Sequence, residues 1–122
     1  MPFADSVTAQ IEFADGSCGQ LVYSAEGDSS FPKEVLTVYA TGLVAEISNF
    51  QELVIHRGRK RKSISFSSKG HAEEMAAWAQ FLRGRAGHPL PYEKSRVSMQ
   101  LTFAVLESIQ KAAAVDVEAI CI

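Results

Sequence analysis

The histidines are the first residues to consider for chemistry, but they are scattered along the chain at His56, His71 and His88. They fall on an expected strand, at an expected helix start and in an expected loop, and no pair has the i, i+4 spacing of a helical metal site. Glu73 and Glu74 fall in the first turn of a helix, where negative charge suits the helix dipole. These residues predict neither a metal centre nor a catalytic set.

Glycine motifs for catalysis or cofactor binding are also missing from the sequence. There is no Gly-x-Ser-x-Gly elbow, no phosphate-cradling loop and no Gly-x-Gly-x-x-Gly fingerprint after a strand. Because a dinucleotide is usually held where a glycine-rich turn opens a helix, we expect no NAD(P) binding by this chain alone.

The most basic segment is the run from Arg57 to Lys62. It could contact nucleic acid or direct localisation. It could equally be a solvated hairpin tip, because Gly58 lies at a turn between two apolar strands. The chain is acidic overall and the run has no interleaved aromatic residues for base stacking. We therefore interpret it as a hairpin tip and expect no nucleic-acid partner.

The loop from Gly27 to Glu34 is the best functional candidate among the connections. It places small, hydroxylated and charged side chains between two strands, where a rigid scaffold could hold a polar substrate. An ordinary surface crossover would have the same composition. The residues alone leave both interpretations open.

The expected secondary structure consists of strands in the first two thirds of the chain and helices in the last third. Alternation of apolar and polar residues predicts a strand at about 7–13, and turn or loop residues then separate further strands at about 18–25, 34–40, 43–48, 51–57 and 61–66. Apolar residues at helical spacing predict helices at about 71–83 and 93–113. Residues 115–122 form either a short strand or a loose tail.

This order predicts one α+β domain over residues 1–122: a mostly antiparallel open sheet of about six strands with two helices packed on one face. The third strand is apolar on both sides, because Val35 and Tyr39 point one way while Leu36 and Val38 point the other. Two helices cover only one face, and a large apolar patch is rarely left in water. We therefore expect a homo-oligomer formed through the open face.

Composition sets the class of protein. The 122 residues are 47% hydrophobic and 21% charged with a net charge of −2, which is typical of a soluble globular domain. No apolar run reaches the roughly 20 residues needed to cross a bilayer, and the start lacks the features of a signal peptide. Cys18 and Cys121 have no metal-like spacing, and we interpret both as thiols. These features predict a cytoplasmic protein without a membrane partner.

Several short motifs, in order, resemble a known family. They are Asp5-Ser6-Val7, Phe13 to Ser17, Tyr23 to Asp28, Ser30 to Glu34, Lys69-Gly70-His71 with Glu74, and Leu106-Glu107-Ser108. The chain resembles the carboxy-terminal domain of the glucose–fructose oxidoreductase, inositol dehydrogenase and rhizopine catabolism protein family. It is most similar to the branch in which this module accompanies a zinc-type alcohol dehydrogenase. The likeness spans about Asp5 to Val117.

The resemblance implies a fold like the carboxy-terminal domain of dihydrodipicolinate reductase. In such enzymes the open sheet face commonly mediates oligomerisation, and the other side builds a substrate pocket against a Rossmann domain. The family's enzymes move a hydride between NAD or NADP and a sugar, cyclitol or related polyol. By this analogy, Asp28, Lys33 and His71 are the candidates for substrate contact.

The sequence departs from the family at its start. The nucleotide-binding Rossmann domain, the lysine of the Glu-Lys-Pro motif and the helix with the Asp-x-x-x-His motif are absent from these residues. No catalytic or cofactor-binding position can therefore be assigned, and we expect no hydride transfer by this chain alone. A non-catalytic, dimerising assembly module is the alternative function. A nucleic-acid-binding domain centred on Arg57 to Lys62 is a weaker one.

Overall fold

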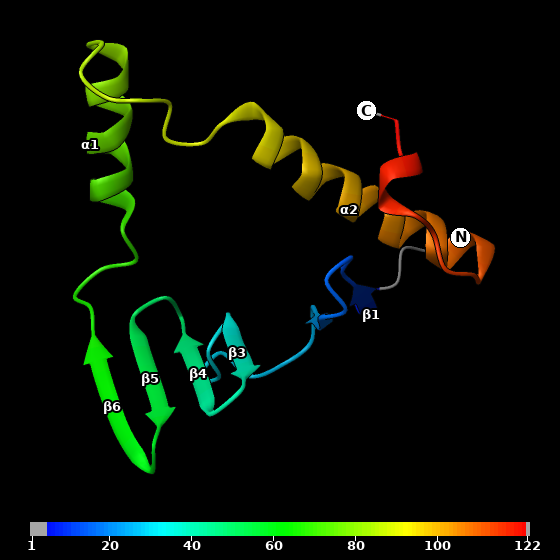
Figure 1. The fold of residues 1–122 in the computed structure, drawn as a ribbon, viewed down its shortest axis with the longest axis horizontal. Helices are drawn as coiled ribbons and strands as arrows, with labels where there is room; N and C mark the ends of the chain where they lie inside the picture. Colours follow the sequence, from blue (N-terminus) through cyan, green and yellow to red (C-terminus); the bar gives the residue numbers. More distant parts are fainter. Residues whose placement is uncertain (1–4, 122) are drawn as a thin grey trace. The chain divides into compact units, whose positions relative to one another are not determined.

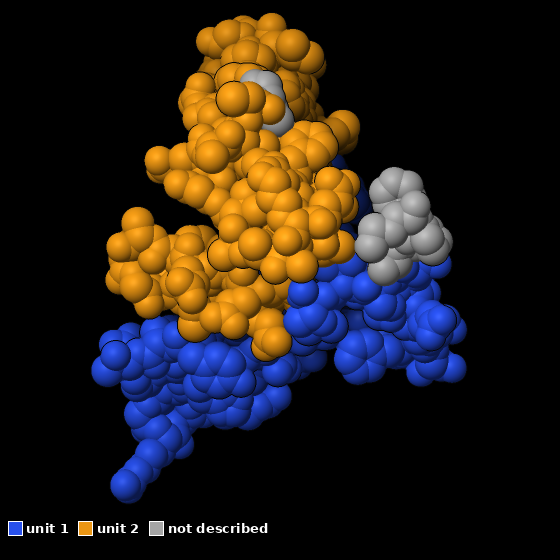
Figure 2. All heavy atoms as spheres, turned by 90° about the vertical axis from the view of Figure 1, so that its right-hand side faces the viewer, with its two compact units in different colours: residues 1–8, 22–73 blue, residues 9–21, 74–122 orange. Residues whose placement is uncertain are grey.

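The computed structural model describes residues 5–121 and contains two antiparallel sheets and two α-helices, which confirms the α+β class. The chain, whose helices and strands are drawn in Figure 1, divides into two compact units, residues up to 8 with 22–73 and residues 9–21 with 74–122, which have different colours in Figure 2. The elements of each unit are described below by themselves.

The first sheet is a hairpin of β1 (Ser6–Glu12) and β2 (Cys18–Ser24). Its turn is closed by the Phe13 N–H, which donates to the Ser17 carbonyl at 2.9 Å. Gly16 takes a φ of 83°, a backbone conformation that a side chain would disfavour. At the open end the Ala25 N–H donates to the Asp5 carbonyl at 2.8 Å. The Asp15-Gly16 turn therefore forms the hairpin that the sequence predicts.

The second sheet is a four-stranded meander. Its strands, in spatial order, are β3 (Val35–Ala40), β4 (Leu43–Ser48), β5 (Glu52–Arg57) and β6 (Lys60–Ser65). Short turns at Gly42 and Gly58 connect β3 to β4 and β5 to β6, and both glycines have positive φ. Every pairing is antiparallel because each connection is short enough to be a hairpin.

The six strands thus divide between two sheets, whereas the sequence suggested one continuous sheet. Each tight turn pairs the strands that flank it, but β2 and β3 are separated by residues 25–34. That connection is too long for a tight hairpin and includes Pro32, which has no N–H to donate. Local turns therefore determine the three strand pairings of the meander and the one pairing of the β1–β2 hairpin.

The register gives the four-stranded sheet two chemically different faces. One face, which we call the apolar face, carries Leu36, Ile47, Leu53, Ile64, Val38, Ala45, Ile55, Ala40 and Leu43, with three cations, Arg57, Lys60 and Lys62, at its β5–β6 corner. The opposite face carries Thr37, Glu46, Ser48, Glu52, Ser63 and Ser65 beside Val35, Tyr39, Val44 and Val54. Apolar residues on both sides are therefore found on β3, and also on β4 at Val44 and on β5 at Val54, which is buried.

Helix α1 (His71–Leu82) begins where its apolar spacing predicts and ends one residue earlier than predicted. Two residues after its end lies Gly84, which has a φ of 69° and whose N–H donates to the Phe81 carbonyl at 2.9 Å. The loop that follows places His88 against the Trp78 and Phe81 rings, with centroid distances of 4.8 and 4.7 Å. Trp78, an apolar residue on one face of α1, thus packs against the loop that follows the helix.

Helix α2 (Tyr92–Lys111) packs against the short helix η1 (Val117–Ala119) and the residues around it. The buried positions here are Gln100, Ala104 and Ile120. The segment predicted as a strand or tail is thus a 3-10 turn packed on α2, while Ile122 lies outside the described residues. Neither α1 nor α2 has the length and apolar character that a bilayer-crossing helix requires. The predicted packing of both helices on one sheet face stays a prediction.

Candidate functional site

Asp28 holds the loop between β2 and β3 in shape. Its Oδ1 accepts the Ser30 N–H at 2.9 Å, and its carbonyl accepts the Phe31 N–H at 3.0 Å. The side-chain and backbone hydrogen bonds from Ser30 hold the pKa of the Asp28 carboxyl below its ordinary value of 3.8. The carboxylate is exposed and charged at neutral pH, so it could also accept from a polyol hydroxyl.

Lys33 lies where the same loop enters the sheet. Its N–H donates to the Asn49 Oδ1 at 2.9 Å, and the Asn49 N–H donates to the Glu34 carbonyl at 2.7 Å. Asn49 has a φ of 50°, which asparagine tolerates better than most residues. This clamp fixes the Lys33 backbone and leaves its side chain exposed.

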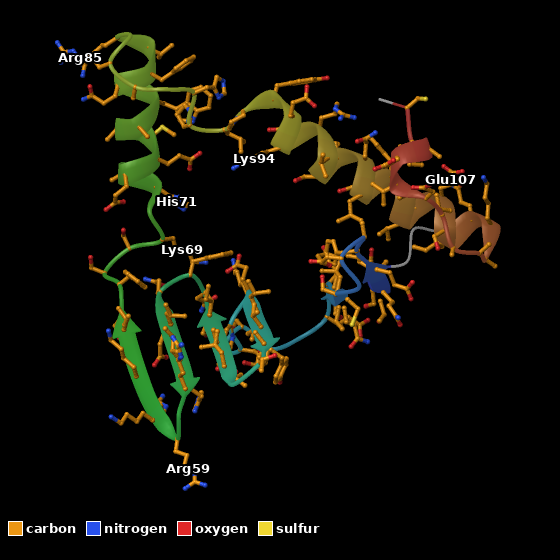
Figure 3. The ribbon with its side chains drawn as sticks, viewed as in Figure 1. Arg59, Lys69, His71, Arg85, Lys94 and Glu107 are labelled. Atoms are coloured by element: carbon orange, nitrogen blue, oxygen red, sulfur yellow. The ribbon has the colours of Figure 1, made fainter. Side chains whose placement is uncertain are left out.

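An ion pair connects this loop to the segment that leads into α1. The Lys69 Nζ lies 2.8 Å from the Glu34 Oε2, and the two side chains are about a third and a half exposed (32% and 46%). His71 follows two residues later, exposed as the first residue of α1 (Figure 3). The pair thereby links the segments that carry Lys33 and His71. We call Lys33, Glu34, Asn49, Lys69 and His71 the loop end of the sheet.

The three sequence candidates are not joined to each other by any hydrogen bond or ion pair among residues 5–121. Lys33 and His71 are instead connected through their neighbours Glu34 and Lys69. Asp28 stays within its own turn. Sequence reasoning missed Asn49 and Lys69 as partners, because Glu34 and Lys69 are 35 residues apart and only the fold places them together.

A shallow depression of about 550 Å³ lies at the opposite end of the four-stranded sheet. Two hairpin turns form it, and the labelled Arg59 marks the tip of the β5–β6 turn (Figure 3). Its lining includes five residues of basic type: His56, Arg57, Arg59, Lys60 and Arg61. Tyr39 of β3 also lines it, in the same cross-strand row as Val44, His56 and Arg61.

The basic depression contains an aromatic residue, whereas the basic run itself has none in its sequence. The run from Arg57 to Lys62 has no aromatic neighbour in sequence, yet the register brings Tyr39 to the same end of the sheet, on the face that carries Arg61. The sequence alone does not predict this approach of Tyr39, because Tyr39 lies on β3 and the run begins at the end of β5. The depression can attract an anion electrostatically, but it is open and its side chains are solvated.

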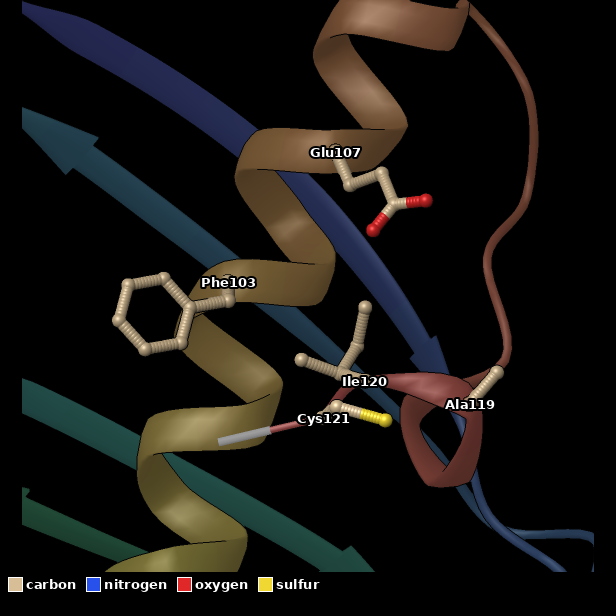
Figure 4. A pocket seen from close by; sticks show the side chains of 5 residues that line it. All are labelled: Phe103, Glu107, Ala119, Ile120 and Cys121. Carbon is tan, nitrogen blue, oxygen red and sulfur yellow. The ribbon is translucent and has the colours of Figure 1, made fainter.

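A second groove, of about 530 Å³, lies between α2 and the residues after it (Figure 4). Phe103 and Glu107 come from α2, and Ala119, Ile120 and Cys121 come from the terminal segment. Glu107 forms an ion pair with Lys111 one turn later. Cys18 and Cys121 are both exposed thiols. The groove contains no set of groups arranged for a reaction.

Metal chemistry finds no support in the described part of the chain, where no three His, Cys, Asp or Glu side chains cluster closely enough to hold an ion. The helix starts do not fit a dinucleotide either. Residues 67–70 before α1 and 88–91 before α2 form no glycine-rich turn, and Pro91 at the start of α2 lacks an N–H.

Comparisons of the chain with protein-family models, with curated proteins and with solved structures found no match.

Proposed function

We propose that this chain is the sheet-and-helix domain of an NAD(P)-dependent oxidoreductase that acts on a sugar, cyclitol or related polyol. In this proposal the chain supplies substrate contacts and subunit assembly, while a Rossmann domain supplies cofactor binding and hydride transfer. The residues described above do not fit NAD(P), so no step of the reaction is assigned to them.

The observation that carries the proposal is the apolar face of the four-stranded sheet. Leu36 and Val38 on this face are 52% and 47% exposed, and none of its residues is buried. Apolar patches of this kind mark surfaces that bind another protein body. The opposite face mixes serine, threonine and glutamate with valines and Tyr39, so the apolar face is the more uniformly apolar of the two over β3 and β4. A Rossmann domain or another subunit that packs on the apolar face would remove its side chains from water.

The loop end supports the substrate part of the proposal. Lys33 and Lys69 carry ammonium donors, Glu34 a carboxylate acceptor, and His71 an imidazole that can do either. Polyols are recognised by such mixed donors and acceptors because each hydroxyl both donates and accepts. The Glu34–Lys69 ion pair fixes two of these groups before a ligand binds. The resemblance of the ordered motifs to the oxidoreductase family favours the same substrate class.

The experiment is to isolate the native protein from its source cells with an antibody raised against this chain. We expect the immunoprecipitate to contain a nucleotide-binding domain, in the same polypeptide or tightly bound. It should also reduce NAD or NADP when sugars or cyclitols are added. Antibody blocked with the purified chain is the control.

A native protein of 13.3 kDa that brings down no dehydrogenase activity would contradict the proposal. That result would favour the alternative, a non-catalytic assembly module, because the apolar face needs a partner in either case.

A further inference from the structure

The two edges of the four-stranded sheet are chemically different. The β6 edge carries Lys60, Arg61 and Lys62, and charges of this kind protect an edge against pairing with another strand. The β3 edge has the sequence Val-Leu-Thr-Val-Tyr-Ala, without a charge or a proline. Tyr39 is 78% exposed, and Val35 is about half exposed. The β3 edge is therefore the one suited to accept a further strand.

The hydrogen-bond pattern shows which β3 residues face outward. The Asn49 N–H donates to the Glu34 carbonyl, so these two residues form a hydrogen-bonded pair of the β3–β4 ladder. Hydrogen-bonded and non-hydrogen-bonded pairs alternate along antiparallel strands, so Leu36, Val38 and Ala40 also form hydrogen-bonded pairs with β4. Val35, Thr37 and Tyr39 then direct their N–H and carbonyl groups away from β4. In the described residues β3 is the last strand of this sheet.

We propose that β3 pairs antiparallel with β3 of a second copy of the chain, about a two-fold axis at Thr37. In this register Thr37 lies opposite Thr37 of the second copy, and Tyr39 lies opposite Val35. Threonine pairs and aromatic–β-branched pairs are both favourable across antiparallel strands. All three outward-facing residues meet outward-facing residues, so their backbone groups satisfy each other.

The same register also continues the apolar face. Leu36 and Val38 lie on that face, and in the paired sheet Leu36 of one copy lies opposite Val38 of the other. The β3 strand is thus self-complementary in its backbone, on its apolar face and on its polar face. A pairing of β6 with β6 would instead bring several cations together. This argument favours a second copy over an unrelated strand.

The inference rests on the assembly part of the proposed function and specifies its contact. It places subunit pairing at an edge, so the apolar face stays open for a nucleotide-binding domain or another body. Closed two-fold pairing is the commonest symmetry of soluble oligomers, and here one strand supplies both halves of the contact.

The test compares two lysine substitutions by light scattering over a range of protein concentrations. The parent chain should approach twice 13.3 kDa. Thr37→Lys places two ammonium groups opposite each other and should weaken dimerisation at least about tenfold. Ser65→Lys, at an exposed position on the same face of the β6 edge, should leave it unchanged. Circular dichroism checks that both variants are folded.

A second measurement does not depend on weakening the dimer. In a chain with Cys18→Ser and Cys121→Ser, Thr37→Cys should cross-link to a covalent dimer with a short bismaleimide, and Ser65→Cys should not. A monomeric parent chain, or a dimer that Thr37→Lys leaves intact and Thr37→Cys does not cross-link, would overturn the inference. Neither result affects the dehydrogenase assay on native protein, so the two proposals fail separately.

Discussion

The Gln100 side-chain amide joins α2 to the end of the chain, donating from Nε2 to the Ile120 carbonyl at 2.7 Å. Its Oε1 accepts from the Arg96 Nη1 at 2.8 Å, so both ends of the amide are used. Gln100 is 7% exposed, and Ile120 is similarly buried. Because a buried carbonyl without a donor is costly, we expect this hydrogen bond to hold the terminal segment on α2.

Replacing Gln100 with Glu should release that segment. Glu keeps the acceptor for Arg96 but loses the donor, leaving a carboxylate facing the Ile120 carbonyl, at a cost of about 1–3 kcal/mol. We expect amide hydrogen exchange over residues 117–120 to become at least about tenfold faster. Gln110→Glu, at an exposed position on the same helix, is the matched control. Equal exchange in the two variants would show that the hydrogen bond does not hold the segment.

The end of α2 offers a stabilising substitution. Ala112 is its C-cap, with a φ of 50° and an N–H that donates to the Ser108 carbonyl. Glycine adopts this conformation without a steric penalty, so Ala112→Gly should raise the free energy of unfolding by about 1 kcal/mol. The control is Ala104→Gly within the same helix, which should lower it by about 1 kcal/mol or more. Urea denaturation measures both, and a loss of stability in Ala112→Gly would contradict the cap geometry.

The parts of this fold that the sequence predicts are those in which the interacting residues are close together along the chain. Apolar periodicity predicts all six strands and both helices, because each pattern lies within one element. The turns at Gly16, Gly42 and Gly58 predict which neighbouring strands pair. The division into two sheets is not predictable in this way, since it depends on whether β2 and β3 pair across residues 25–34.

The candidate site shows the same limit. Asp28 and Ser30 interact within one turn, which a loop rich in small polar residues suggests. The Glu34–Lys69 ion pair joins two loops that are 35 residues apart, and the approach of Tyr39 to the basic hairpin depends on strand register. Gln100 was missed for a different reason: it is polar, and its burial is explained only by the carbonyl and guanidinium that it contacts.

The β1–β2 turn should respond to acid. The Asp15 Oδ1 accepts from the Ser17 hydroxyl at 2.6 Å and the Ser17 N–H at 2.9 Å, and these bonds hold the pKa of the Asp15 carboxyl below 3.8. A depressed pKa means that the stabilisation is present above about pH 3.8 and is lost as the pH falls through the lower, folded-state value. Carboxyl-carbon NMR titration should show the low pKa.

The Ser17 hydroxyl is the larger cause of that shift, so Ser17→Ala should raise the pKa of Asp15 toward its ordinary value. Ser6→Ala, which removes a hydroxyl at the other end of the hairpin, is the matched control. If Ser17→Ala leaves the titration of Asp15 unchanged, the hydrogen bonds are not its cause.

The aromatic cluster after α1 contains the chain's single tryptophan, which makes it directly observable. His88 meets the Trp78 ring edge-on at 4.8 Å, and its Nδ1 accepts the Leu90 N–H at 3.1 Å, so the loop is held at both points. His88→Ala should lower the free energy of unfolding by about 1 kcal/mol. It should also shift Trp78 emission to longer wavelength, because the ring loses its cover.

His88→Phe separates the two contacts of that histidine. It keeps an aromatic edge against Trp78 and removes the acceptor for Leu90, so Trp78 emission should stay close to that of the parent while the amide of Leu90 exchanges faster. Gln80→Ala, at an exposed position on α1, controls for changes in the helix itself. An emission shift in His88→Phe as large as that in His88→Ala would mean that the Leu90 hydrogen bond, rather than ring packing, keeps the loop on Trp78.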